Sequence, residues 1–184
     1  MTLRTLVLAL PLAALIGLAA RTAAAAPLTV ASDFEGASVR VLDIDQNARS
    51  VDFMPGGDPA RGWPCWWFFR IDGVTPGEAV TLRLQGSLAS IGNRKPLSSS
   101  WAMPARAAWS EGGNNWQQTD KGTRDGEWMV YTLEPQSDSV HVAWGPPFTP
   151  KNAQTLVDTL SESSPHATAK ELCRSRSGRP VPLL

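Results

Sequence analysis

The chain has 184 residues, with 17 basic and 17 acidic side chains, 2 histidines and 2 cysteines. Nucleic-acid binding needs clustered positive charge, and Arg174, Arg176 and Arg179 form only a small basic turn. This composition argues against a nucleic acid as partner. The histidines and cysteines match no recognised zinc spacing, and the sequence has neither a Gly-x-Ser-x-Gly elbow nor a glycine-rich phosphate loop.

Residues 1–26 are predicted to be a signal peptide. Arg4 gives a positive start, an apolar run follows, and Ala23 to Ala26 supply small residues for cleavage. A membrane anchor is disfavoured because the apolar run is shorter than a typical membrane span. We therefore expect a periplasmic or secreted protein with no membrane contact after cleavage, and with 15 basic against 17 acidic residues.

Residues 27–148 are predicted to form one mainly β domain. Val80, Leu82 and Leu84 alternate with polar residues, as in a half-buried strand. The unbroken aromatic run from Trp66 to Ile71 suits a strand that is buried on both faces. Short strands at this spacing, with a long loop over residues 86–100, are typical of an antiparallel β-sandwich. The strands are expected near residues 28–30, 38–43, 51–53, 66–71, 80–85, 105–109, 128–133 and 139–144.

One helix is predicted after the sandwich, over residues 149–164. Thr149 is a good N-cap residue, and Pro150 occupies the first helical position. An apolar stripe recurs at helical spacing along this segment, at Ala153, Leu156, Val157 and Leu160. We interpret it as a connecting helix.

The segment 165–184 is predicted to contain a hairpin, with a polar turn at residues 174–178 followed by the apolar strand Val181 to Leu184. That strand is expected to lack a partner. We therefore interpret residues 165–184 as the start of a further domain that is truncated in this sequence.

Eight tryptophans accompany a single tyrosine. Indoles fill cores, and they also offer stacking surfaces to sugars or peptides. Trp67, Trp128 and Trp144 lie in predicted strands and are expected in the core, whereas Trp63 and Trp66 stay undecided. Trp101, Trp109 and Trp116 flank the long loops and form the candidate binding surface.

Few residues could carry catalysis. His141 lies between two valines in a predicted strand, and His166 follows a proline in a polar loop, so both are interpreted as structural. No catalytic, metal-binding or cofactor-binding residue is predicted. Cys65 and Cys173 could pair in an oxidising compartment, although Cys65 lies in an aromatic run that favours burial as a free thiol.

Four segments stand in order along the chain: Ser32-Asp33-Phe34-Glu35-Gly36-Ala37, the run from Trp66 to Val74, the run from Ser139 to Thr149, and the run from Cys173 to Leu184. Their order and spacing together resemble the amino-terminal domain of the zinc metallocarboxypeptidases related to the cytosolic carboxypeptidases.

The resemblance implies that a β-sandwich precedes an α/β carboxypeptidase domain, whose first hairpin would be the terminal segment. The family's zinc ligands, a His-x-x-Glu pair and a later His, match no position in this sequence, and neither does its general base. The implied function is a non-catalytic companion domain, inactive alone, whose partner is a downstream carboxypeptidase domain. Zinc and a peptide substrate belong to the parent family. The alternative is a stand-alone tryptophan-rich module that binds a glycan or a peptide.

Overall fold

The computed structural model describes residues 25–56, 65–86 and 101–184. The signal peptide expected over residues 1–26 lies outside the described residues except for its last two positions. Trp63 and residues 87–100 of the predicted loop lie outside them as well. Within the described part, no helix combines the length and the apolar character needed to cross a membrane.

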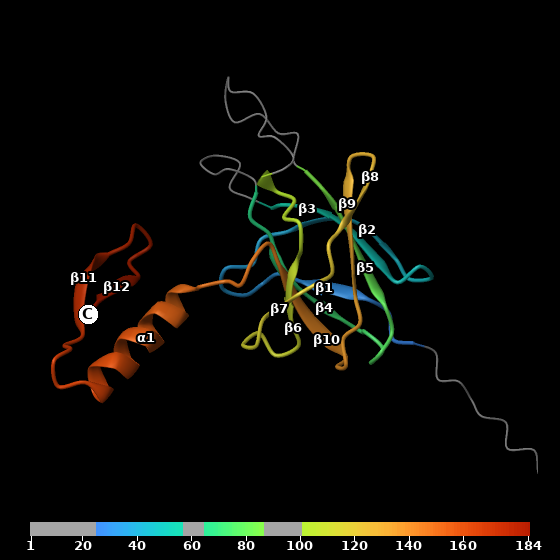
Figure 1. Cartoon of the computed structure of the whole chain (residues 1–184). Coiled ribbons are helices and arrows are strands. Elements are labelled where there is room, and N and C mark those ends of the chain that lie inside the picture. Colours follow the sequence, from blue (N-terminus) through green and yellow to red (C-terminus); the bar gives the residue numbers. More distant parts are fainter. Residues whose placement is uncertain (1–24, 57–64, 87–100) are drawn as a thin grey trace, which may run out of the picture.

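Two β-sheets pack face to face as a sandwich, as the strand pattern predicted (Figure 1). In the described residues, each of these sheets has five strands. The first sheet has the order β1 (Thr29–Ala31), β4 (Phe68–Asp72), β10 (Ser139–Ala143), β6 (Ala108–Ser110) and β7 (Gln117–Gln118). The second has the order β2 (Arg40–Asp45), β3 (Ser50–Met54), β5 (Val80–Gln85), β9 (Trp128–Leu133) and β8 (Thr123–Asp125).

One strand pair departs from the antiparallel expectation. β3 and β5 are parallel, with Ser50 opposite Thr81 and Phe53 opposite Leu84. Between them the chain crosses to the other sheet and forms β4. This long connection lets β5 return in the direction of β3, which a short hairpin could not do.

The core lies between the sheets, where the inward positions of each strand meet. On β5, Val80, Leu82 and Leu84 are all fully buried, as their alternation predicted. On β4, Phe68 and Phe69 face opposite sides and are both buried, but Arg70 and Asp72 on the side of Phe68 are partly exposed, so the expectation of a strand buried on both faces holds only at its start. The polar residues between these positions lie on partly exposed faces.

Trp67 is confirmed as a core residue, with no exposed surface. The expectation was wrong for Trp128, which is only half-buried on the outer face of β9. Met129 and Tyr131 occupy inward positions of that strand, so alternation turns Trp128 outward, where the Arg83 guanidinium lies 4.7 Å from the ring centroid. The pattern predicted two faces of β9 correctly but did not show which of them the first sheet covers.

The core prediction was also wrong for Trp144, which is 42% exposed. Trp144 shares the side of Val140 and Val142 by alternation, but it follows Ala143, the last residue of β10. At this end of the sheet the indole is only partly covered. Its N–H donates to the backbone carbonyl of Trp101 at 3.0 Å.

Helix α1 (Pro150–Ser163) confirms the predicted helix and its cap. The Thr149 hydroxyl accepts a hydrogen bond from the Asn152 backbone N–H at 3.4 Å. The Asn152 side chain accepts one from the Thr149 backbone N–H at 2.8 Å. This reciprocal pair is a capping box, which satisfies backbone donors that the first helical turn leaves free.

The predicted terminal hairpin is present, but its last strand has a partner. β12 (Pro180–Leu183) pairs antiparallel with β11 (Lys170–Arg174), so the expectation of an unpaired strand was wrong. The partner was missed because residues 170–174 are mostly polar and show no burial pattern. The two strands form a separate ribbon that contacts α1.

We call residues 148–184 the arm; it comprises α1, β11 and β12. It extends to one side of the sandwich (Figure 1). None of its residues is buried.

Candidate functional site

The described residues offer three candidate sites: the predicted tryptophan surface, the surroundings of the histidines, and the junction between the sandwich and the arm. The tryptophan surface was predicted from Trp101, Trp109 and Trp116. The structure places these residues in three different settings. Trp116 and Trp109 line two different hollows, and Trp101 is 58% exposed and lines neither.

The first hollow, of about 410 Å³, lies between the sandwich and α1. Phe68 and Trp116 contribute from the sandwich, with their rings 5.7 Å apart in an edge-to-face arrangement. Phe148, Asn152 and Leu156 contribute from the arm. The lining contains no Asp, Glu, Lys or Arg side chain, so this hollow suits an uncharged group.

The second hollow, of about 480 Å³, lies where the chain passes from β7 in one sheet to β8 in the other. Trp109 is half-buried there and packs partly against the core. The rest of the lining is mostly polar and includes Gln118, Lys121, Thr132 and Glu134. One indole among hydrogen-bonding side chains is a composition that suits a sugar or another polar ligand.

His141 lies beside the first hollow, on β10. Its ring makes edge-to-face contact with Phe34 at 5.7 Å and lies 6.1 Å from Phe68. Burial lowers the pKa of His141, and the charge of Arg70 lowers it further; Asp72 and the Ser110 backbone oppose this shift. The residue is thus held in an aromatic environment.

Tyr131, the single tyrosine, is buried in the core, and its hydroxyl donates to the backbone carbonyl of Pro104 at 2.6 Å. Burial raises the pKa of this phenol above its ordinary value, against a smaller opposite effect of Arg124. The shift arises from desolvation in a structural position rather than from a neighbouring catalytic group.

Among the described residues, no three His, Cys, Asp or Glu side chains are grouped so that they could hold a metal ion. Cys65 and Cys173 are both free, so the disulfide that the sequence left open is not formed. The described part of the chain therefore does not fit the zinc ligand set of the family named above.

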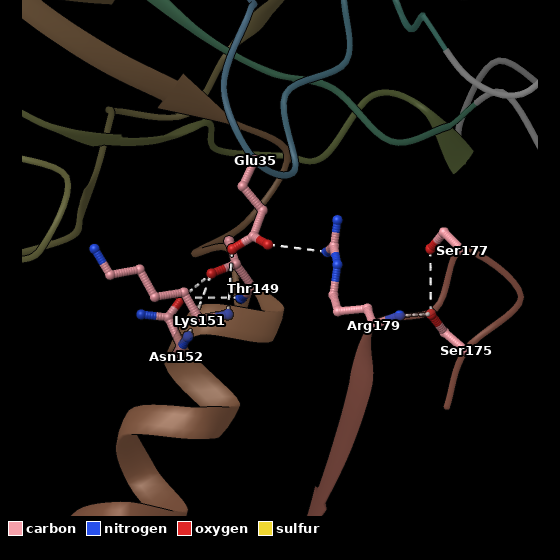
Figure 2. A network of polar contacts seen from close by, with 7 residues as sticks. All are labelled: Glu35, Thr149, Lys151, Asn152, Ser175, Ser177 and Arg179. Atoms are coloured by element: carbon pink, nitrogen blue, oxygen red, sulfur yellow. Dashed lines mark hydrogen bonds and ion pairs between the residues drawn. The ribbon is translucent and has the colours of Figure 1, made fainter. Parts of the chain in front are cut away.

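The junction between the sandwich and the arm contains a residue that the sequence reasoning missed. The Glu35 carboxylate accepts two hydrogen bonds from the arm, one through each oxygen (Figure 2). Oε2 accepts from the backbone N–H of Lys151 in the first turn of α1, at 3.2 Å. Oε1 accepts from the guanidinium of Arg179, at 2.9 Å. The sequence pointed to Glu35 only within the segment Ser32 to Ala37 that carries the family resemblance, because its partners are 116 and 144 positions away.

Comparisons with known proteins agree with this architecture. A family model described as the cytosolic carboxypeptidase N-terminal domain matches residues 30–144. A metallo-carboxypeptidase from Burkholderia cenocepacia aligns with a TM-score of 0.67 and 21% identity, over 84% of this chain and 38% of its own. One from Pseudomonas aeruginosa, in complex with (2-guanidinoethylmercapto)succinic acid, aligns with a TM-score of 0.64 and 18% identity, over 84% and 39%.

No curated protein matches this chain significantly. At the identities of the two solved structures, the likeness shows the fold alone. The chain spans about two fifths of the length of each of them.

Proposed function

The chain belongs to the family of the cytosolic carboxypeptidase N-terminal domain, and from this premise we propose that it is the companion domain of a zinc metallocarboxypeptidase. In this proposal the sandwich supports a carboxypeptidase domain that follows it, the ribbon of the arm is the first hairpin of that domain, and neither the sandwich nor the arm carries a catalytic group. The zinc ligands and the general base belong to that following domain, and the substrate is a peptide. The setting is the periplasm or the outside of the cell, as the apolar segment in residues 1–26 indicates.

The observation that carries this proposal is the exposure of the arm. A helix of 14 residues and a two-stranded ribbon, none of whose residues is buried, gain little from packing. Isolated helices of this length and isolated ribbons are marginally stable in water. Phe148 is 68% exposed and Leu172 is 61% exposed. Exposed apolar surface of this kind marks a site of contact with another domain or protein. In the two solved metallocarboxypeptidases, more than half of the chain lies outside the aligned part and could supply that contact.

The test compares two purified proteins. One is the chain from residue 27 to 184, and the other extends it through the next 250 or so residues encoded at the locus, about the size of one domain. We expect zinc and carboxypeptidase activity in the extended protein alone. Zinc and activity in the short chain would overturn the proposal, as would an extended protein with neither.

A second candidate function, a binding module, is favoured by the second hollow. Trp109 and the polar side chains around it could hold a neutral oligosaccharide without any further domain. Isothermal titration calorimetry of the short chain with chito-oligosaccharides tests this second function. Binding that Trp109→Ala abolishes and Trp101→Ala retains would favour this module, and the absence of any heat of binding would count against it.

A further inference from the structure

The turn that carries Glu35 is fixed rigidly to the sandwich. On one side of Glu35, the Phe34 ring packs edge-to-face against Phe68, with centroids 5.0 Å apart. On the other side, Gly36 adopts a φ of +82°, which favours glycine. The Gly36 carbonyl accepts a hydrogen bond from the Trp66 indole at 3.0 Å. Glu35 therefore projects from a fixed point of the sandwich.

The partners of Glu35 are fixed to the arm in the same way. Lys151 lies in the first turn of α1, between the two capping-box residues Thr149 and Asn152. Arg179 closes the turn of the ribbon, because its backbone N–H donates to the Ser175 hydroxyl and its carbonyl accepts from the Ser175 N–H (Figure 2). One carboxylate thus joins a fixed turn of the sandwich to both elements of the arm. Its charge also suits the positive end of the helix dipole.

Within the part of the chain that the structure describes, few other polar contacts join the arm to the sandwich. The first hollow separates α1 from Trp116 and Phe68, so apolar packing between helix and sandwich is incomplete. Thr149 approaches the turn at Gly36, where an added Cβ would lie 3.4 Å from the Thr149 methyl carbon. The angle of the arm therefore depends largely on Glu35.

From this geometry we propose that Glu35 is a positioning residue, which sets the angle of the arm and thereby the place at which the carboxypeptidase domain sits against the sandwich. The role of Glu35 in placing the carboxypeptidase domain rests on the proposed function. Its effect on the angle between the arm and the sandwich concerns this chain alone. Exposed ion pairs are individually weak and are screened by salt. The arm should therefore be held at low ionic strength and released at high ionic strength.

The two cysteines allow a direct test without added labelling sites. Cys65 lies on the sandwich and Cys173 on β11 of the arm, and both are free. Spin labels on these thiols report the distance between sandwich and arm by pulsed electron paramagnetic resonance. In the wild-type chain, residues 27–184, we expect one narrow distance distribution in 50 mM salt and a broader one in 1 M salt.

Glu35→Gln removes the negative charge that pairs with the Arg179 guanidinium, and Arg179→Gln removes the guanidinium itself. In 50 mM salt, we expect each variant to give a distance distribution as broad as that of the wild type in 1 M salt. Glu171→Gln is the matched control, since Glu171 pairs with Arg174 at 3.0 Å within the ribbon and does not reach the sandwich. Its distribution should match the wild type. Melting temperatures should be unchanged in all three variants, which separates positioning from loss of fold.

A broad distribution in the wild type at low salt would overturn the proposal. A narrow wild-type distribution that Glu35→Gln and Arg179→Gln leave unchanged would also overturn it. The same holds if Glu171→Gln broadens the distribution as much as Glu35→Gln does. Failure of the proposed function is a separate result, because it appears as an extended protein without zinc or activity. The distances in the short chain do not depend on that outcome.

Discussion

The indole N–H of Trp67 donates a hydrogen bond of 3.0 Å to the backbone carbonyl of Ala102. Trp67 has no exposed surface, and its ring lies 5.2 Å from Phe53 and 6.4 Å from Tyr131, measured between centroids. The bond joins the start of the interior strand β4 to the segment that leads into β6. It thereby satisfies a polar group in the centre of the core, where an unpaired one would be costly.

Trp67→Phe should lower the free energy of unfolding by about 1–3 kcal/mol, because the Ala102 carbonyl loses its buried donor. Trp67→Ala should lower it by about 3–5 kcal/mol, since a cavity is added. Urea denaturation followed by circular dichroism measures both. Trp144→Phe is the control: it loses an exposed hydrogen bond to Trp101 and should cost at most about 1 kcal/mol. Equal losses at both tryptophans would contradict the assignment of Trp67 to the core.

Gly73→Ala should destabilise the fold by at least about 1–3 kcal/mol. Gly73 has a φ of +78°, and an added Cβ would collide with the backbone carbonyl of Pro27. The same glycine accepts a hydrogen bond from the buried Arg49 guanidinium at 2.6 Å. The matched control is Gly112→Ala, where no atom lies within 4 Å of the added carbon. Urea midpoints compare the two, and a Gly73→Ala midpoint equal to that of the control would refute the prediction.

Stability should fall as the pH decreases below about 6.5, the ordinary histidine value. Burial, followed by the Arg70 charge, lowers the pKa of His141 in the folded state. The unfolded chain then binds the proton more readily, so the contribution of His141 is present above pH 6.5 and is lost as the pH falls through the lowered folded value. Asp72, which pairs with Arg70 at 2.8 Å, only reduces this effect.

The pH prediction is measured by urea unfolding between pH 5 and 7.5. His141→Gln should show a smaller decrease in stability over this range than the wild type. Parallel pH dependences of the two proteins would show that His141 is not the group responsible.

The short chain should self-associate through its arm as its concentration rises. Leu156 is 48% exposed and Leu160 is 39% exposed on the same helix, and burying a leucine is worth about 1.5–3 kcal/mol. Replacing both by Gln should weaken association about tenfold or more. Sedimentation velocity compares this variant with Thr159→Gln, which changes a neighbouring polar residue. A wild-type chain that stays monomeric at high concentration would argue against an apolar surface on the arm that a partner normally covers.

Features set by neighbouring residues could be predicted from the sequence. The capping box of α1 joins Thr149 and Asn152, which are three positions apart, so its signature is local. The alternation on β5 is local as well, because successive side chains of a strand point to opposite faces. The family resemblance, based on the order of several short segments, was confirmed by the family match over residues 30–144.

Features that depend on distant parts of the chain were decided only by the tertiary structure. Alternation on β9 leaves two possible inward faces, and the position of the first sheet decided that Trp128 points outward and Tyr131 inward. The parallel pairing of β3 with β5 followed from a crossing through the other sheet. The junction at Glu35 joins residues 144 positions apart, and no local pattern encodes such a pair. Short-range sterics and hydrogen bonding thus determined the elements, whereas burial and long-range charge contacts, which exist only after the chain has packed, determined which side chains meet.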